Sequence, residues 1–366
     1  MIPFRFIAGT LHPDHDTLAT FRKTFLPELK DVFVQVLLFA QVAGALKLGT
    51  ISLDGTKIHA DASKSKAVSY KRLLALETHL RTEVEDLFAL SEQVDQSDLP
   101  DGLVVRDEIA IRQARLARLA DANAVLVARA TERTALEQAA YTATIQERAE
   151  KARQTGRQPG GRPPKPPTPG PRDTDQYNGT DPESRIMKHS STEGFEQDYN
   201  AQIAVDQASM LIVGESLSNH PNDQQEVEPT LDSIPPALGT PDAAALDTGY
   251  FSAANILLFE HRQIEPYSAT GRDPHHPSWW ERFVAAGEPP AADASPKVKM
   301  AYKLKTVIGQ TIYRARKCTV EPVIGIIKEV LGFRQFSLRG ERAAAGEWCL
   351  VCLAFNLKRL HTLLAG

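Results

Sequence analysis

The sequence predicts an α/β protein in which a mixed sheet is flanked by helices and interrupted by a long inserted helical hairpin. Three observations support this. Short apolar segments that resemble strands alternate with helical segments from residue 195 onward. Residues 66–153 are instead rich in Ala, Leu, Glu and Arg, which favours long helices. A Pro/Gly-rich stretch then separates this helical segment from the strands that follow.

Residues 1–47 are interpreted as a helical N-terminal segment, with two helices between residues 16 and 48. Asp16 or Thr17 can cap the first helix, and Pro27 suits the first turn of the second. The apolar face expected for the second helix comprises Val32, Val36, Leu37, Phe39 and Leu46.

Residues 48–65 are expected to form the first strands of the core. Apolar and polar residues alternate there, and Asp54-Gly55 is a strong tight-turn pattern. The prediction is therefore a hairpin whose strands are Leu48 to Asp54 and Lys57 to Ala60.

Residues 66–153 are predicted to form a helical hairpin, broken between Asp95 and Gly102. An apolar stripe marks the second helix at Ile109, Leu116, Leu119 and Leu126. Residues 154–175 are interpreted as a Pro/Gly-rich basic linker without helix or central strand. Contact with phosphates is conceivable for this linker, but a plain linker is the preferred interpretation.

Residues 176–366 are assigned to the remainder of the core and the C-terminal helices. The expected strands are 195–206, 210–219, 243–249 and 264–269. The expected helices are 224–234, 252–262 and a mainly helical segment from Lys297 to the end, with turns near Gly332 and Gly340.

Composition narrows the class of protein. Three cysteines are too few for a disulfide scaffold, no run of eighteen apolar residues suggests a membrane span, and no secretory signal is recognisable, so a cytoplasmic location is expected. The formal net charge of −4 argues against a polyanionic partner only when it is averaged over the chain. Between Lys297 and Arg342, eleven Lys and Arg face three Glu, a local field that attracts polyanions if it is not merely a solvated helix face.

Three acidic residues are candidates for chemistry. Asp54 and Asp247 are expected at strand ends, where open α/β sheets place their sites, and Glu321 is expected on a helix whose apolar neighbours turn it toward the sheet. Lys328, seven residues later, shares its helix face, and Lys317 precedes it by four. Each acid alone has an ordinary interpretation, as a turn former or as a solvated side chain.

Three carboxylates together suit phosphodiester chemistry. Two Mg²⁺ ions about 3.5–4 Å apart can activate a nucleophile and stabilise the leaving oxygen in line. Mg²⁺ prefers the hard oxygen ligands that Asp and Glu provide, and it requires neither His nor Cys.

Other motifs have weaker functional interpretations. Cys349 and Cys352 form a C-x-x-C on an apolar helix, but they lack a second ligand pair, so core packing is favoured over zinc. Two histidine pairs lie in Pro-containing turns without acid clusters: His12 with His15, and His275 with His276. Trp279 and Trp280 could stack on an unpaired base, although ordinary burial is the more common role of tryptophan.

The sequence blocks around the three acidic residues resemble those of a known family. These blocks are residues 48–70, residues 181–188 with 194–206 and ALDTGYFSAANI, and residues 313–340. With these blocks in this order, the sequence resembles the DDE-class bacterial insertion-sequence transposases, in the branch whose Glu sits in a Tyr…Arg…Glu…Lys string.

The resemblance implies a ribonuclease H-like core that uses two Mg²⁺ or Mn²⁺ ions for DNA cleavage and strand transfer. It identifies Asp54, Asp247 and Glu321 as the catalytic and metal-binding acids. Tyr313, Arg316 or Lys317, and Lys328 become the DNA-contacting residues. Arg316 lies one residue further from Glu321 than in the common string and Lys317 lies at the usual distance, so the basic role stays open between them.

The implied partners are double-stranded DNA, as element ends and as target, and a second copy in a homodimer that synapses two ends. Such relatives carry more helical sequence before the segment that matches Ile2 to Phe25, so N-terminal truncation is expected. Two alternatives remain: a truncated, non-catalytic DNA-binding remnant that regulates transposition, and a nuclease without strand transfer.

Overall fold

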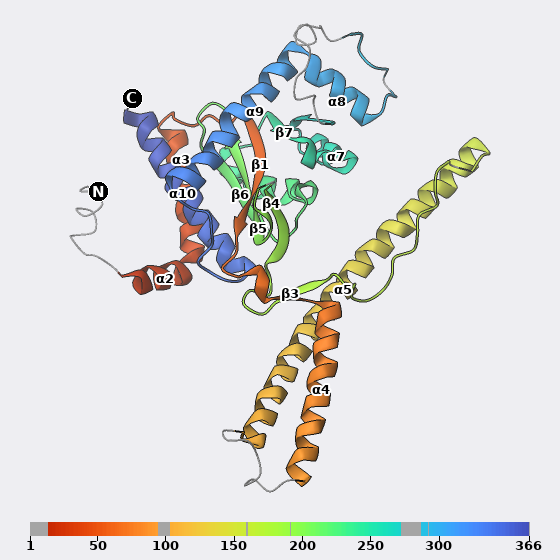
Figure 1. Ribbon diagram of the computed structural model, residues 1–366. Coiled ribbons are helices and arrows are strands. Elements are labelled where there is room, and N and C mark those ends of the chain that lie inside the picture. Colours follow the sequence, from red (N-terminus) through yellow and green to blue (C-terminus); the bar gives the residue numbers. More distant parts are fainter. Residues whose placement is uncertain are drawn as a thin grey trace. The chain divides into compact units, whose positions relative to one another are not determined.

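The computed structural model describes residues 14–93, 103–158, 160–190, 192–271, 287–291 and 293–365. The chain divides into two compact units (Figure 1). The first combines Met1–Ser63 with Glu183–Gly366, and the second is Lys64–Pro182. His12, His275, His276, Trp279 and Trp280 lie outside the described residues.

A six-stranded mixed sheet forms the centre of the first unit. Its strands are β1 (Thr50–His59), β4 (Arg185–Ser190), β5 (Gly194–Asp206), β6 (Ile212–Ser218), β7 (Ala243–Leu246) and β8 (Glu265–Ser268). The order is β4-β5-β1-β7-β8, and β6 also pairs with β5. β5 runs antiparallel to β1, β4 and β6, whereas β7 runs parallel to β1 and β8. The predicted mixed sheet flanked by helices is confirmed.

The predicted hairpin at Asp54-Gly55 is wrong, because β1 continues through both residues. Every residue from Ile51 to His59 pairs with β5, and Gly55 lies opposite Gln202. A methyl group on Gly55 would lie 2.2 Å from the Gln202 Nε2 atom. Gly55 therefore allows a close cross-strand approach instead of a turn, which is a recognised use of glycine inside a strand. Asp54 consequently lies within the strand and not at its end.

The first unit also contains helices. They are α2 (His15–Thr24), α3 (Leu26–Val42), α6 (Val227–Asp232), α7 (Ala253–His261), α8 (Pro296–Lys305), α9 (Val307–Gly325) and α10 (Glu341–Ala365). Asp14 caps α2 by accepting a hydrogen bond from the Thr17 amide at 2.7 Å, so neither Asp16 nor Thr17 is the cap.

The buried face of α3 differs from the predicted one. Val32 and Phe39 are exposed, whereas Leu29 and Phe33 are buried together with Leu37. Helical spacing fits more than one stripe on this apolar helix, and packing against α10 selects the stripe that is buried.

Helix α9 packs against the sheet and carries Arg316 and Glu321. It contacts β1, β5, β7 and β8, and Figure 1 shows it crossing β1. Thr306 caps its N-terminus by accepting from the Gly309 amide. Pro322 lies inside the helix, and a π-helical turn, η7 (Ile326–Val330), follows directly. Because of this turn, the backbone between Glu321 and Lys328 is not a regular α-helix, so the two residues need not share the helix face that their sequence spacing predicts.

α10 is the one helix among the described residues that is long and apolar enough to cross a membrane. Its packing explains the apolar composition, because it lies against α3 and β6 and buries Trp348, Cys349 and Cys352. The Trp348 Nε1 atom donates to the Gln202 carbonyl at 3.1 Å. The predicted core role of the two cysteines agrees with this burial.

The second unit is built on the antiparallel pair α4 (Tyr70–Gln93) and α5 (Val105–Thr155), with the short strands β2 (Ala67–Ser69) and β3 (Gln176–Asn178). A small core forms around Leu73 and Leu126. The described residues of the expected linker contain neither helix nor strand after α5 ends. Arg133 fastens the far end of this linker to α5, because Nη1 lies 2.9 Å from both Asp175 carboxylate oxygens.

Candidate functional site

Asp54 lies on the central strand β1 in a largely desolvated position. Its side chain is 19% exposed, and Oδ1 accepts a hydrogen bond from the Gly55 amide at 2.9 Å. Burial raises the pKa of Asp54 to about 6; the Arg316 cation opposes this shift, while the Asp247 carboxylate adds to it. Burial therefore disfavours the ionised form of this carboxyl group.

Asp247 comes directly after the adjacent parallel strand β7, close enough to Asp54 for its charge to raise the pKa of Asp54. Ser52 on β1 pairs with Ala245 on β7, so Asp54 and Asp247 each lie two residues beyond one matched pair. Asp247 caps the short 3-10 helix η5 (Thr248–Tyr250), and its Oδ1 accepts from the Gly249 amide at 2.6 Å. The cap fixes the start of the Asp-Thr-Gly-Tyr segment beside β1.

Arg316 joins Asp54 to Glu321. Its Nη1 lies 2.9 Å from Asp54 Oδ2, and its Nη2 lies 3.6 Å from Glu321 Oε1. Burial alone would lower the pKa of Arg316, but Asp54, Asp247 and Glu321 all act to raise it. This buried guanidinium therefore experiences the field of all three predicted acids. The Glu321 side chain is 52% exposed, so it borders the group from the solvent side.

A fourth carboxylate, Asp223, belongs to the same group and was missed by the sequence analysis. Its Oδ1 accepts from Lys57 Nζ at 3.2 Å, from Asn200 Nδ2 at 2.8 Å and from Gln202 Nε2 at 3.0 Å. A methyl group on Gly249 would lie 3.0 Å from Asp247 Oδ1 and 3.5 Å from Asp223 Oδ2. Asp223 and Asp247 are thus neighbours. No local pattern marks Asp223, since its partners come from two other strands.

Tyr250 packs beneath the carboxylates. Its hydroxyl donates to the Gln202 Oε1 atom. Burial raises the pKa of Tyr250 well above its ordinary value, and the charges of Asp54, Asp223 and Asp247 raise it further. The phenol therefore stays neutral and contributes a fixed hydrogen bond to the residue that holds Asp223.

The predicted DNA-contacting residues do not all lie on one surface. Tyr313 and Lys317 line a groove of about 590 Å³ formed by α8, α9 and the chain after β8. Lys305 and Arg314 line it too, and none of the described lining residues is acidic. The Thr248 hydroxyl donates to the Gly271 carbonyl, which ties this groove to the segment after Asp247.

Arg316 and Lys328 are not on that groove. Arg316 is buried against Asp54. Lys328 lies in the π-helical turn, and its Nζ donates to the Lys57 carbonyl at 2.9 Å. The structure therefore brings Arg316, and not Lys317, to the acidic group, while Lys317 is exposed on the groove.

A family model described as "Transposase DDE domain" matches residues 291–361. The matched segment contains Glu321, Tyr313, Arg316 and Lys317, while Asp54 and Asp247 lie outside it. No curated protein and no solved structure matches the chain significantly. The match supports a relationship to the DDE-class transposases over this C-terminal segment.

Proposed function

We propose that this protein is a transposase that cleaves DNA at the ends of an insertion sequence and joins them to target DNA, with Asp54, Asp247 and Glu321 holding two Mg²⁺ or Mn²⁺ ions. The observation that carries the proposal is the electrostatic coupling of these three acids through one buried arginine. The mixed sheet, with Asp54 on β1 and Asp247 directly after the parallel strand β7, is compatible with the ribonuclease H-like core that the resemblance implies.

The donor chemistry fits hard divalent ions. The group consists of carboxylates, and Asp54 pays a desolvation cost that raises its pKa to about 6. Repulsion from Asp247 and Asp223 contributes to that shift, so added positive charge would stabilise the ionised group. Bound ions would lower the pKa of a water or hydroxyl nucleophile and stabilise the leaving oxygen.

The protein residues would position the DNA around these acids. Lys305, Arg314 and Lys317 would bind phosphates in the groove beside the Asp247 segment, and Tyr313 would contact the backbone there. Arg316 would hold Asp54 and Glu321 in place and offset part of their mutual repulsion. Asp223, fixed by Lys57, Asn200 and Gln202, would orient the loop that presents Asp247.

The test is a divalent-metal-dependent nicking and strand-transfer assay on DNA that carries the terminal repeats of the element. Asp54→Asn, Asp247→Asn and Glu321→Gln should each abolish cutting while DNA binding, measured by mobility shift, persists. Near-normal cutting by any one variant would remove that residue from the assigned set.

The same assay separates the competing functions. Wild-type protein that binds the ends but never cuts them would be a regulatory remnant. Cutting without joining would indicate a nuclease. A synaptic homodimer is part of the proposal, because two ends must be held together; light scattering of the protein with and without end DNA measures it. A complex that never exceeds one protein chain would rule this part out.

A further inference from the structure

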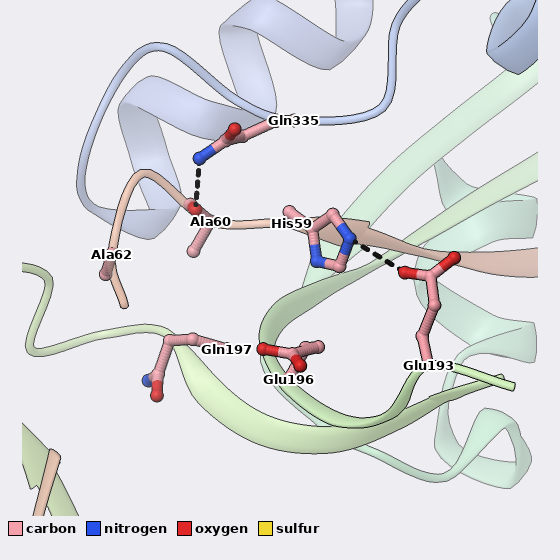
Figure 2. Close-up of a pocket in the computed structure, with 7 residues that line it drawn as sticks. All are labelled: His59, Ala60, Ala62, Glu193, Glu196, Gln197 and Gln335. Carbon is pink, nitrogen blue, oxygen red and sulfur yellow. Dashed lines mark hydrogen bonds and ion pairs between the residues drawn. The ribbon is translucent and has the colours of Figure 1, made fainter. Parts of the chain in front are cut away.

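Two histidines and two carboxylates meet at the far end of β1, away from the acidic group described above. His59 is the last residue of β1, His189 lies on β4, and Asp198 lies on β5 opposite His59. Glu193 precedes β5. Figure 2 shows the His59 ring directed at Glu193 beside a pocket of about 340 Å³, which Gln197 and Gln335 also line.

Asp198 orients both rings from the buried side. Its side chain is 0% exposed, with Oδ1 2.8 Å from His59 Nδ1 and Oδ2 2.9 Å from His189 Nδ1. The tautomer that carries its proton on Nδ1 lets each ring donate to one oxygen of this carboxylate. A carboxylate that receives the Nδ1 proton is the usual outer partner of a metal-binding histidine.

The opposite ring nitrogens face a single carboxylate oxygen. His59 Nε2 lies 3.2 Å and His189 Nε2 lies 3.7 Å from Glu193 Oε2. With Nδ1 protonated, both Nε2 atoms present lone pairs to an anionic oxygen, and a cation bound among these three atoms would turn that repulsion into attraction. Protonating both rings would stack two positive charges, because the ring centroids are 4.1 Å apart at an interplanar angle of 15°.

We propose that His59 Nε2, His189 Nε2 and Glu193 bind one divalent transition-metal ion such as Zn²⁺, with Asp198 as the buried orienting carboxylate. Zn²⁺ bonds of about 2.0–2.2 Å in a tetrahedral site separate neighbouring ligand atoms by roughly 3.3 Å. The two nitrogen-to-oxygen distances, 3.2 and 3.7 Å, bracket that value. The rings must tilt further apart than 15° for both lone pairs to meet one ion.

The site would keep one coordination position open. Three protein ligands leave a fourth position for water, and Glu193 is 49% exposed at the pocket. Imidazole with carboxylate suits Zn²⁺ and its neighbours, whereas Mg²⁺ prefers oxygen ligands alone. The site would therefore differ in metal preference from the acidic group at Asp54.

The experiment measures Zn²⁺ binding to the full chain by calorimetry in excess Mg²⁺, which occupies sites made of oxygen ligands only. Co²⁺ replaces Zn²⁺ in a parallel absorption measurement that reports tetrahedral coordination. One high-affinity ion per chain and a tetrahedral Co²⁺ spectrum are expected. His59→Ala and His189→Ala should lose both, and Asp198→Asn should weaken affinity roughly 10–100-fold.

Two further variants show whether a loss of Zn²⁺ binding comes from a missing ligand or from unfolding. Glu193→Gln changes an exposed side chain and should lower affinity without unfolding the protein, checked by circular dichroism. His220→Ala is the matched control, because His220 also pairs with a buried carboxylate, Glu226, but has no second histidine in that pair. It should bind Zn²⁺ like wild type. Failure of folded wild-type protein to bind Zn²⁺, or unchanged binding in His59→Ala and His189→Ala, would overturn the proposal whatever the DNA-cutting assay returns.

Discussion

Asp54, a proposed metal ligand, has a pKa that burial raises. Its pKa of about 6 lies above the value of 3.8 expected in the unfolded chain. The protonated form therefore contributes stability below pH 3.8 that is lost as the pH rises through about 6. A bound divalent ion needs the ionised form, so metal affinity should rise across the same interval.

We expect the Mn²⁺ affinity of the folded protein to increase between pH 5 and pH 7, as titrated by calorimetry. Competition between protons and the ion for Asp54 is the reason. Asp54→Asn should show weaker binding with a shallower pH dependence. An identical pH profile in the variant would mean that Asp54 does not control binding.

Asp223 lies beside Asp247, so its charge should affect metal binding. Asp223→Asn should retain the fold, because an amide oxygen can still accept from Lys57, Asn200 and Gln202. It removes a negative charge beside Asp247, so we expect divalent-metal affinity to fall roughly 10–100-fold, as for other groups adjacent to metal ligands. DNA affinity should be unchanged. Wild-type metal affinity in this variant would limit Asp223 to a structural role.

Glu215 on β6 predicts a pH dependence of stability away from the site. Burial raises the pKa of Glu215 to about 7, against weaker opposing effects of Cys349 and Lys30. Its stabilising contribution is complete below pH 4.5 and is lost as the pH rises through about 7. Glu215→Gln should therefore gain stability relative to wild type from pH 5 to pH 8, measured by urea unfolding. Parallel stability profiles for the two proteins would contradict this.

Gly55 in strand β1 lies against the Gln202 side chain of β5. Gly55→Ala would place a methyl group 2.2 Å from Gln202 Nε2. Gln202 also holds Asp223 and Tyr250, so it cannot move without loosening both. We expect a destabilisation of about 1–3 kcal/mol in urea unfolding, together with reduced metal affinity.

Gly325→Ala is the matched control for that substitution. Gly325 ends α9, and a methyl group there meets no described atom within 4 Å beyond its chain neighbours and the backbone of its own helix. Alanine is favoured over glycine in a helix, so this variant should be unchanged or slightly more stable. If Gly55→Ala were equally harmless, the close approach to Gln202 would not constrain β1.

The elements differ in how far the sequence predicts them. Residues 195–206 and 210–219 are correctly predicted strands, because apolar runs with a short turn fit an antiparallel pair. The predicted turn at Asp54-Gly55 is wrong because β1 continues through both residues. Gly55 has no side chain, which leaves room for the Gln202 side chain of β5 beside the strand. Asp223 and the His59–His189 cluster depend on contacts between distant strands, which local patterns do not encode.

At the scale of the whole molecule, charge is distributed unevenly. The chain has a net charge of −4, but the groove beside Asp247 is lined by Lys305, Arg314 and Lys317 and, within the part of the chain that the structure describes, by no acidic side chain. Phosphate binding depends on the local cations that displace counterions, and each contact contributes about 0.9 to the slope of log affinity against log salt. DNA affinity should therefore follow this groove and not the total charge.

The combined variant Lys305→Ala/Lys317→Ala tests this placement by fluorescence anisotropy on duplex DNA at several salt concentrations. Affinity should fall for every DNA sequence, and the salt slope should decrease by about 2 if both lysines contact phosphates. Lys151→Ala is the control, because Lys151 lies on α5 in the second unit and pairs with Glu147. A double variant with the wild-type slope would place the DNA elsewhere, and an equal loss in Lys151→Ala would shift the binding surface toward the helical insertion.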